Sequence, residues 1–292
     1  MKRIAFVTYY SEVESPEEYV IFLLKKIKPF YDTIILISNS PLSEKARTTL
    51  HRYSDQIIER QNSGYDFAAW AAGIQSVGWA RLEKYDQLTL LNTTCFGPIF
   101  PLEPVYASME QKGNDFWGMT NFRETSGIGW YPGGTIPEHI QSYFLSFAHK
   151  TFMSKTFRSF IDAISDDIPR DDVIINYETK LTGLLKKAGF SYDVIFSTID
   201  LPVVEYIDYS RYDATACIDA GVPFVKIKAF IPENNRRNID IVKHIEERSK
   251  YPTKLIRKYF DRHNRELIAE LFHHSNTKQK IKSKLKRLLG KG

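Results

Sequence analysis

A polar segment rich in hydrogen-bonding side chains joins a short predicted strand to a predicted helix. It contains Asn62, Gly64, Tyr65 and Asp66. Gly64 allows a tight turn, and the backbone amides at the start of the following helix favour anions and hydrogen-bond acceptors. The carboxylate of Asp66 either caps this helix or accepts a hydrogen bond from a hydroxyl of a nucleotide ribose or a sugar. A diphosphate would repel a carboxylate, so the second interpretation places Asp66 on the ribose or the sugar.

Neutral polar side chains stand at the end of the next predicted strand, where Asn92, Thr93 and Thr94 follow one another. Divalent cations such as Mg²⁺ and Mn²⁺ prefer carboxylate oxygens. We therefore assign no metal ligands here, and the sequence gives little support for a metal cofactor. If the ligand is a nucleotide sugar whose diphosphate leaves during a reaction, basic side chains or backbone amides would have to stabilise the negative charge of that diphosphate in place of a metal. Lys226 and Lys228, late in the chain, are candidates for this role, and the alternative is that they are solvated residues on a strand face.

Carboxylates that could act as a general base lie on a predicted helix in the second half of the chain. Glu178 sits at the edge of its apolar stripe, between Ile174 and Leu181. A partly buried carboxylate at this position suits removal of a proton from a hydroxyl near neutral pH. The alternative is an ion pair with a lysine or arginine. Asp171 and Asp172 begin the same helix, where capping explains at least one of them, and each is a second choice for the base.

Two further candidates lie between these groups. His139 precedes a predicted helix with apolar residues spaced over positions 140–147, and it either binds substrate or faces solvent. Trp130 lies in the segment Ser126–Gly134, which combines glycines with large aromatic residues. Such a segment is typical of a mobile loop that closes over a ligand, or of a variable surface loop.

These residues lie near the ends of alternating predicted strands and helices. The predicted strands cover residues 4–9, 33–38, 56–59, 87–92, 115–120 and 222–230. The predicted helices begin at a capping serine, Ser15, and near residues 43, 63, 140, 173 and 239. This alternation predicts an α/β fold with a mostly parallel, Rossmann-like sheet flanked by helices. Because such sheets bind ligands at the carboxyl ends of their strands, Thr8 and Tyr9 join the candidates.

The composition of the 292 residues, 43% hydrophobic and 26% charged, is that of a globular protein. No apolar run approaches the roughly 18 residues of a membrane span, and the first residues do not have the pattern of a signal peptide. The motifs GxGxxG, GxxxxGK(S/T), HExxH and GxSxG are absent, which weighs against the usual dehydrogenases, kinases and hydrolases. Cys95 and Cys217 form no CxxC pair, so we expect reduced thiols in the cytoplasm.

The net charge of +5 is concentrated at the end of the chain. Ser275–Gly292 contains seven basic residues and no acidic one, and its apolar residues recur with helical spacing. A short cationic amphipathic helix can lie on an anionic membrane surface, and the alternative is a solvated terminus. No nucleic-acid-binding motif accompanies the charge, so we do not predict nucleic acid as a partner. The tail thus predicts a cytoplasmic protein at the inner face of the plasma membrane.

Short pieces of the sequence, taken in order, carry a resemblance to a known family. They are Tyr9-Tyr10, Asn62 to Trp70, Leu90-Leu91-Asn92 with Gly97-Pro98, Asp115 to Thr120, His139 to Phe144, Tyr177-Glu178 with Leu181-Thr182, and Pro223 to Lys226. Together they resemble the rhamnan synthesis F (RgpF-type) family of bacterial polysaccharide glycosyltransferases, over roughly residues 2–230.

The resemblance implies a GT-A-like fold and transfer of a sugar, expected to be rhamnose, from a nucleotide-sugar donor to a growing glycan or lipid-linked acceptor. We expect this domain to cover residues 1–238, with a helical extension over 239–292. Carried over by position, the donor site would contain Asn62, Gly64, Tyr65, Asp66 and Asn92, with His139, Gln141 and Ser142 near the cleft. Glu178 matches the family's Tyr-Glu pair. The family often has an aspartate where this chain has Thr93.

These inferences combine into one hypothesis with two alternatives. The hypothesis is an inverting glycosyltransferase with Glu178 as the base and Thr8, Tyr9, Thr93 and Lys226 among the donor-binding residues. Trp130, Gln141 and Ser142 would contact the substrates. The first alternative is a catalytically silent subunit that binds nucleotide sugars or glycans, which the neutral Thr93 favours. The second is a membrane-surface scaffold of a polysaccharide assembly complex that works through its basic tail. The oligomeric state is not predicted.

Overall fold

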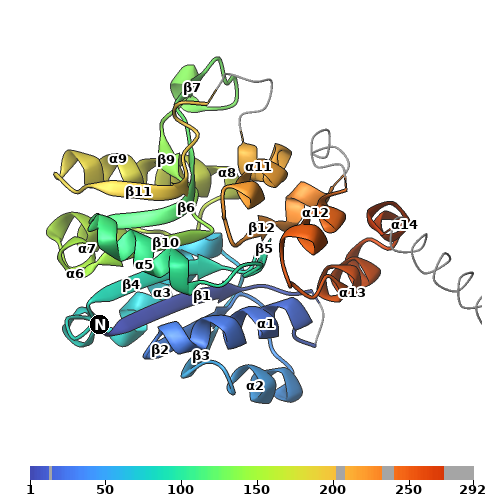
Figure 1. Cartoon of the computed structure of the whole chain (residues 1–292). Helices are drawn as coiled ribbons and strands as arrows, with labels where there is room; N and C mark the ends of the chain where they lie inside the picture. The colour runs from blue at the N-terminus through green and yellow to red at the C-terminus, as the bar shows by residue number, and fades with distance from the viewer. Residues whose placement is uncertain (13–14, 202–207, 232–239, 273–292) are drawn as a thin grey trace, which may run out of the picture.

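A mixed, mostly parallel β-sheet forms the centre of the molecule (Figure 1). The structure is a computed structural model that describes residues 1–12, 15–201, 208–231 and 240–272. Within this part of the chain the main sheet follows the order β11-β6-β10-β4-β1-β2-β3, and β9 pairs with β6. Its strands are β1 (Arg3–Tyr9), β2 (Thr33–Ser38), β3 (Gln56–Glu59), β4 (Gln87–Asn92), β6 (Phe116–Phe122), β9 (His139–Ile140), β10 (Phe144–Ala148) and β11 (Tyr192–Phe196).

Parallel pairing brings the candidate residues of neighbouring strands to the same level. β1 pairs in parallel with both β2 and β4, and Thr8 lies opposite Ile37 on one side and Asn92 on the other. β2 and β3 are also parallel, as are β6 and β11. The prediction of an α/β fold with a mostly parallel sheet is therefore confirmed.

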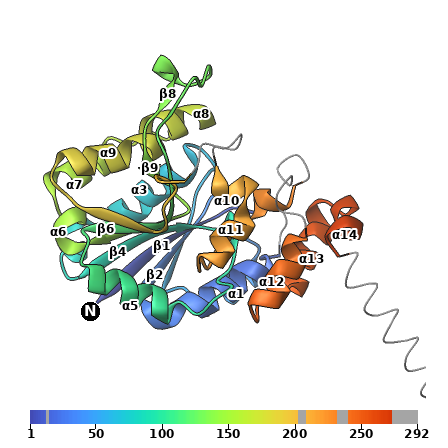
Figure 2. The ribbon, with the colours of Figure 1, turned by 45° about the horizontal axis from the view of Figure 1, so that its top comes forward.

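Helices cover both faces of the sheet because its strands alternate buried side chains between two hydrophobic clusters (Figure 2). In β1, Ala5 and Val7 belong to one cluster, and Ile4 and Phe6 belong to the other. The first cluster packs under α1 (Glu18–Ile27), α2 (Glu44–Leu50), α5 (Glu103–Lys112), α11 (Ala214–Asp219), α12 (Ile241–Arg248) and α13 (Lys254–His263). The second packs under α3 (Tyr65–Val77), α4 (Trp79–Leu82), α6 (His149–Phe152), α7 (Lys155–Asp162) and α9 (Thr179–Lys187).

The remaining elements are short. Two small antiparallel pairs are β5 (Cys95–Phe96) with β12 (Val225–Lys226), and β7 (Thr125–Ser126) with β8 (Thr135–Ile136). The short helices are α8 (Arg170–Val173), α10 (Tyr209–Tyr212), α14 (Glu266–Leu271), and the 3-10 turns η1 (Lys28–Phe30), η2 (Pro132–Gly134) and η4 (Ile227–Phe230). A π-helical turn, η3 (Ile174–Glu178), connects α8 to α9.

The helix predicted over residues 140–147 is wrong. This segment forms β9 and β10, and β10 runs antiparallel between β4 and β6. Phe144 contributes to one hydrophobic cluster, whereas Leu145 and Phe147 contribute to the other. A strand buried on both faces has a nearly continuous apolar sequence, which also matches a helical period over a short window.

Two other sequence predictions need correction. Within residues 222–230, only Val225–Lys226 forms a strand, because its partner β5 is itself two residues long. The first helix begins at Glu18 rather than after a serine cap at Ser15. Glu17, the residue before this helix, is buried and accepts a hydrogen bond from His263 at 2.9 Å, so a contact with the C-terminal part of the chain lies at the start of the helix.

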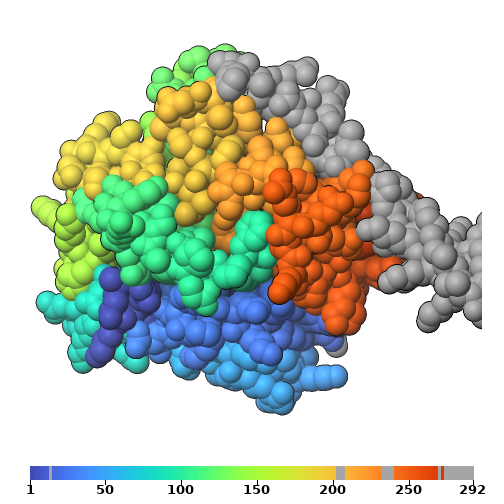
Figure 3. All heavy atoms as spheres, in the orientation of Figure 1, coloured from blue at the N-terminus to red at the C-terminus, as the bar shows by residue number. Residues whose placement is uncertain are grey.

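The C-terminal helices share a hydrophobic cluster with the N-terminal part of the chain. Ile256 and Phe260 of α13 belong to the same cluster as β1 and α1, and Phe22 packs edge-to-face on Tyr251 at 5.2 Å between ring centres. Figure 3 shows the atoms of these helices lying directly against the first third of the chain. The segment predicted as a helical extension therefore completes the core as far as residue 272. Its basic tail, residues 275–292, lies outside the described residues. In the described part of the chain, no helix is both long enough and apolar enough to cross a membrane.

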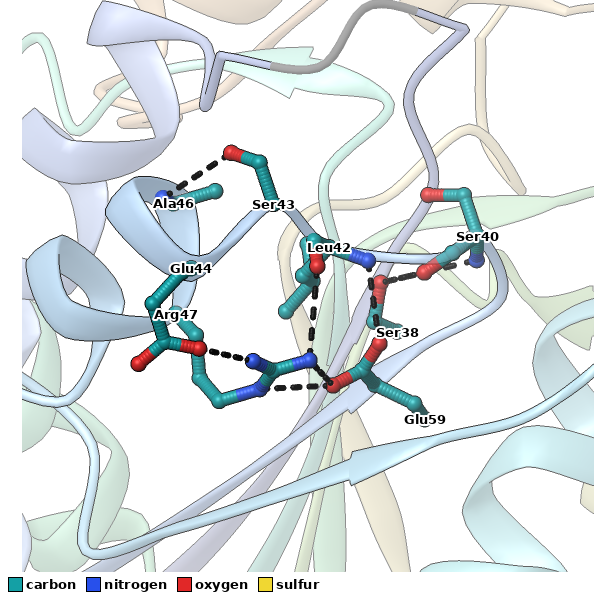
Figure 4. A network of polar contacts seen from close by, with 8 residues as sticks. All are labelled: Ser38, Ser40, Leu42, Ser43, Glu44, Ala46, Arg47 and Glu59. Carbon is teal, nitrogen blue, oxygen red and sulfur yellow. Dashed lines mark hydrogen bonds and ion pairs between the residues drawn. The ribbon is translucent and has the colours of Figure 1, made fainter.

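A carboxylate at the end of β3 fixes the loop that leaves β2 (Figure 4). Glu59 accepts a hydrogen bond from the amide of Leu42 at 2.9 Å and two from the guanidinium of Arg47 at 2.7 and 2.9 Å. The hydrogen bond from Leu42 and the charge of Arg47 lower the pKa of Glu59. Ser43 caps α2, the helix predicted to begin near residue 43, by accepting a hydrogen bond from the amide of Ala46. These contacts tie the loop after β2 to the carboxyl end of β3, and β2 itself pairs with β1.

Candidate active site

A large cleft opens at the carboxyl ends of the parallel strands, with a volume of about 1260 Å³. Most of the predicted site residues line it, although they come from distant parts of the sequence. The predicted residues in its wall are Thr8, Asn62, Tyr65, Asp66, Asn92, Thr93, Trp130, His139, Gln141, Ser142, Glu178, Lys226 and Lys228. The parallel-sheet rule thus predicted the location of the cleft.

A hydrogen-bonded carboxylate and amide stand at the centre of the sheet edge. Asn92 donates from Nδ2 to Oδ2 of Asp66 at 2.8 Å, and its Oδ1 accepts from the amide and the hydroxyl of Thr94 at 3.2 and 2.7 Å. Burial raises the pKa of Asp66 to about 6, and the nearby charge of Glu178 adds to the rise, while hydrogen bonds from Asn92 and Thr8 oppose it. Asp66 therefore changes its charge close to neutral pH.

The turn that carries Asp66 requires a glycine. Gly64 has a φ of +62° and precedes α3, and a Cβ there would lie 2.6 Å from that of Ala68 and 2.7 Å from the Cα of Asp166. Gly64 thus shapes the turn, but it is not among the residues that line the cleft. The capping interpretation of Asp66 is wrong, because its carboxylate bonds to Asn92 on a neighbouring strand while α3 has no side-chain cap.

Glu178 lines the same cleft as this pair, and its charge acts on Asp66. Its Oε1 accepts hydrogen bonds from the backbone amide of Ser142 at 3.0 Å and from the hydroxyl of Ser142 at 2.9 Å. Glu178 ends the π-helical turn, a rare local geometry that often occurs at functional sites. Both hydrogen bonds end on one oxygen, so Oε2 is available to take a proton. The predicted alternative, an ion pair of Glu178 with a lysine or arginine at contact distance, is not found among the described residues.

An ion pair between Lys226 and Asp208 also lines the cleft. Lys226 Nζ donates to Oδ2 of Asp208 at 3.2 Å and lies over the ring of Tyr143 at 5.5 Å. Asp208 also accepts hydrogen bonds from Gln141 at 3.0 Å and from Ser210 at 2.6 Å. The charge of Lys226 lowers the pKa of Asp208 against the effect of burial, and Asp208 raises the pKa of Lys226. Lys226 is therefore a cation held in a fixed position, and not a solvated residue on a strand face.

His139 and Trp130 approach the cleft from the β7–β8 side. His139 lies on β9 instead of at the head of a helix, is 5% exposed, and stacks on Phe122 at 5.2 Å. Trp130 is 58% exposed and lies in the loop between β7 and β8, which projects from the body (Figure 1). The neighbouring Tyr131 is buried and its hydroxyl contacts that of Thr179 at 2.8 Å. Closure of this loop over a ligand stays a prediction.

Besides Gly64, three predicted residues do not line the cleft. Tyr9 is 1% exposed and packs in the hydrophobic cluster under α1, because alternate residues of a strand face opposite sides. Tyr10, one residue later, lines the cleft instead. Asp171 and Asp172 lie on α8 but are not among the lining residues, although the preceding Arg170 is.

Several lining residues were missed by sequence reasoning. Asp208, Arg170 and Arg211 are the charged ones, and Tyr259 of α13 is an aromatic one. No local motif surrounds Asp208 or Arg211. Arg211 lies in α10, a helix of one turn, and Asp208 directly precedes it. Their placement depends on contacts between segments more than 60 residues apart, such as Gln141 with Asp208, and a single sequence carries no signal for these.

The cleft residues fit a divalent metal poorly. Within the described ranges, no three His, Cys, Asp or Glu side chains are grouped so that they could hold a metal ion. At the end of β4, Asn92 is engaged by Asp66 and Thr94, and Thr93 offers a hydroxyl in place of a carboxylate. The three carboxylates in the wall already accept hydrogen bonds: Asp66 from Asn92, Glu178 from Ser142, and Asp208 from Lys226.

Loss of Asp208 should destabilise the fold. In Asp208→Asn, Lys226 loses the carboxylate that offsets its burial, and the two side chains are each 20% exposed. We expect an unfolding free energy about 2 kcal/mol lower in urea denaturation. The double variant Asp208→Asn/Lys226→Met should regain part of this loss, and Asp261→Asn, exposed on α13, should change it by less than about 0.5 kcal/mol. Equal stability of Asp208→Asn and the wild type would show that the pair contributes nothing.

Comparisons with known proteins agree with the sequence resemblance. The family described as rhamnan synthesis protein F (RgpF) matches residues 34–288. The uncharacterised protein y4gN of Sinorhizobium fredii is 26% identical over 168 residues, which are 58% of this chain and 42% of that protein. Virulence protein VirA of Vibrio anguillarum is 26% identical over 171 residues, covering 57% and 49%. The matched region thus spans about half the length of these curated relatives.

Solved structures show a more distant likeness. A protein of Desulfovibrio desulfuricans, provisionally described as a nucleotide-diphospho-sugar transferase, is 12% identical with a TM-score of 0.44, covering 93% of this chain and 99% of that one. Core-mannan synthase A of Aspergillus fumigatus, in a form with manganese and GDP, is 10% identical with a TM-score of 0.36, covering 66% and 70%. Because the family match extends over most of the chain, this protein belongs to the rhamnan synthesis protein F family.

Proposed function

We propose that this protein is a glycosyltransferase with a GT-A-like fold that moves a sugar from a nucleotide donor to a growing glycan. One observation carries the proposal. One cleft at the carboxyl edge of the sheet is lined by a hydrogen-bonded carboxylate, Glu178, by a polar pair, Asp66 with Asn92, and by a held cation, Lys226. The family description, rhamnan synthesis, supports rhamnose as the sugar and a polysaccharide as the product.

Glu178 would act as the general base. The acceptor hydroxyl loses its proton to Oε2 of Glu178 while its oxygen attacks the anomeric carbon of the donor. Ser142 holds the carboxylate through two hydrogen bonds to Oε1, which fixes its orientation. Attack from the face opposite the leaving group inverts the configuration at the anomeric carbon. The bond from that carbon to the diphosphate oxygen breaks, and the electron pair leaves with the nucleoside diphosphate.

The sheet edge would hold the donor. Asp66 and Asn92 present a carboxylate and an amide to hydroxyls of the ribose or the sugar, and Thr8 and Asn62 line the same region. Tyr65 begins α3 and lines the cleft, and backbone amides at the start of a helix favour an anion. Lys226 adds a positive charge whose position is set by Asp208. The wall near Trp130, His139 and Gln141 is left for the acceptor.

A catalytically silent binding subunit is the second candidate. The neutral end of β4 favours it, because Thr93 stands where the family often has an aspartate. A silent subunit would bind a nucleotide sugar in the same cleft without consuming it. The membrane-scaffold alternative and the anionic-membrane partner depend on the basic tail, which lies outside the described residues, and they stay predictions, as does a location at the inner face of the plasma membrane.

A purified-protein assay tests the proposal. We expect at least one nucleotide sugar, with nucleotide rhamnose as the first choice, to raise the melting temperature, because a ligand at 100 times its Kd adds about 2.7 kcal/mol of stability. We also expect release of the nucleoside diphosphate when a glycan acceptor is added. Binding without release in the presence of acceptors, with or without added Mg²⁺ or Mn²⁺, would favour the silent subunit. The absence of binding by every nucleotide sugar would contradict both candidates.

A further inference from the structure

Four cationic side chains gather along one wall of the cleft. Arg170 begins α8, Arg211 belongs to α10, Lys226 lies on β12 and Lys228 lies on η4, and all four line the cleft. They come from three separate stretches of the chain. Burial lowers the pKa of Lys228, and the positive charges of Arg170, Arg211 and Lys226 lower it further. The other three positive charges are therefore close enough to act on Lys228.

Such a grouping costs free energy in the absence of an anion, because like charges repel. Asp208 offsets part of the repulsion, since its carboxylate acts on both Lys226 and Lys228. The side chain of Arg211 also lies over the ring of Tyr212 at 5.1 Å, which restrains its guanidinium at the cleft. A multiply charged anion bound between these groups would be attracted by all four positive charges.

We propose that Arg170, Arg211, Lys226 and Lys228 form a diphosphate-binding site that lets this protein stabilise a leaving diphosphate without a divalent metal. The proposal rests on the proposed function and extends it. Guanidinium groups bind phosphate oxygens through paired hydrogen bonds, and ammonium groups add point charges. When the bond between the anomeric carbon and the diphosphate oxygen breaks, the electron pair and its negative charge pass to that oxygen. The cationic wall stabilises this charge, while the acceptor proton goes to Glu178.

The carboxylates and the cations of the cleft suit two different roles, proton removal by Glu178 and diphosphate binding by the four basic residues. The carboxylates of Asp66 and Glu178 influence each other electrostatically, and Arg170 also acts on Asp66. The described residues offer no group of ligands for a metal, so the cations are the groups in the wall that can neutralise a diphosphate. Two sources could supply the same diphosphate chemistry: the nucleotide donor, or an acceptor carried on a lipid diphosphate.

The test measures binding of diphosphates in the presence of EDTA. The probes are UDP, dTDP, GDP, inorganic pyrophosphate and farnesyl diphosphate, with the corresponding nucleoside monophosphates for comparison. We expect a diphosphate to bind in EDTA with an affinity that falls as salt rises. Arg170→Gln, Arg211→Gln and Lys228→Gln should each weaken it about tenfold or more and affect the monophosphates less. Arg52→Gln and Lys187→Gln, at exposed positions outside the cleft, are matched controls.

Each outcome either supports the site or overturns it. A loss confined to the nucleoside diphosphates assigns the site to the donor, and a loss confined to farnesyl diphosphate assigns it to a lipid-linked acceptor. Unchanged affinity in all three cleft variants overturns the site, as does binding that appears only when Mn²⁺ or Mg²⁺ replaces EDTA. In that last case, sugar transfer that requires the metal leaves the proposed glycosyltransferase function intact. Arg211→Lys should restore part of the lost affinity, which a folding defect would not predict.

Discussion

Turnover of the Glu178→Gln variant is expected to fall by at least about a hundredfold, because positioned general bases contribute roughly 10²–10⁴ to the rate. Glutamine can still accept the hydrogen bonds from Ser142 at its Oε1, so the local geometry should persist. It cannot take a proton from the acceptor hydroxyl. Affinity for the donor should change by less than about threefold, because the proposed role of Glu178 is to contact the acceptor hydroxyl and not the donor. Release of nucleoside diphosphate under saturating donor and acceptor measures the effect.

Controls for this prediction separate three carboxylates. Glu247→Gln on the exposed part of α12 should keep full activity. Asp171→Asn and Asp172→Asn test the other bases considered from the sequence, and we expect normal turnover because neither residue lines the cleft. A full rate in Glu178→Gln together with a large loss in either aspartate variant would move the base to α8.

The strand ends were predictable because parallel pairing follows from local patterns. Short apolar runs marked β1, β2 and β4, and β2 is also rich in β-branched residues. The rule that ligands bind at the carboxyl ends of such strands brought Thr8, Asn92 and Asp66 together from the sequence alone. The rule does not say which of the last residues of a strand points into the cleft and which points into the core. A shift of one position turned Tyr9 into the core and put Tyr10 in the cleft.

The other half of the site could not be derived from one sequence. Its residues lie on short elements whose places depend on long-range packing: β9 and β10, mistaken for a helix, and α10, a single turn. Ser142 can hold Glu178 only because the chain between β9 and β10 passes the π-helical turn. Asp208 meets Lys226 and Gln141 through contacts 18 and 67 residues apart. Hydrophobic period predicts which segments are buried, but it does not say which buried segments become neighbours.

Replacing Asp66 should make the protein more stable while it weakens donor binding. Burial raises the pKa of this carboxyl from 3.8 to about 6. Between these pH values the folded protein holds a proton that the unfolded chain has lost, so the stability of the wild type falls as pH rises from about 4 to about 6. In Asp66→Asn the side chain does not ionise, and its amide oxygen can accept the hydrogen bond that Asn92 gives to Asp66.

The difference between Asp66→Asn and the wild type should therefore grow with pH. We expect the variant to be more stable by about 1–3 kcal/mol at pH 7 and to lose this advantage below about pH 4, as measured by urea denaturation. Glu59→Gln is the matched control with the opposite sign. The pKa of Glu59 is lowered by Leu42 and Arg47, so its stabilising effect is present at neutral pH and is lost as the pH falls. A pH-independent difference for Asp66→Asn would contradict the buried, ionising carboxylate.

Donor affinity gives the second half of this prediction. An ionised Asp66 accepts hydrogen bonds from sugar or ribose hydroxyls, and a hydrogen bond to a charged group contributes about 1.5–3 kcal/mol. Nucleotide-sugar binding by the wild type should therefore strengthen as pH rises through about 6, and Asp66→Asn should bind at least about tenfold more weakly at pH 7.5. If Asp66 served only to pack the core, a rise in pH would not lower the stability of the protein and strengthen nucleotide-sugar binding over the same pH range. A variant that gains stability and binds the donor normally would place the donor elsewhere in the cleft, whereas loss of both would mean that Asp66 supports the fold.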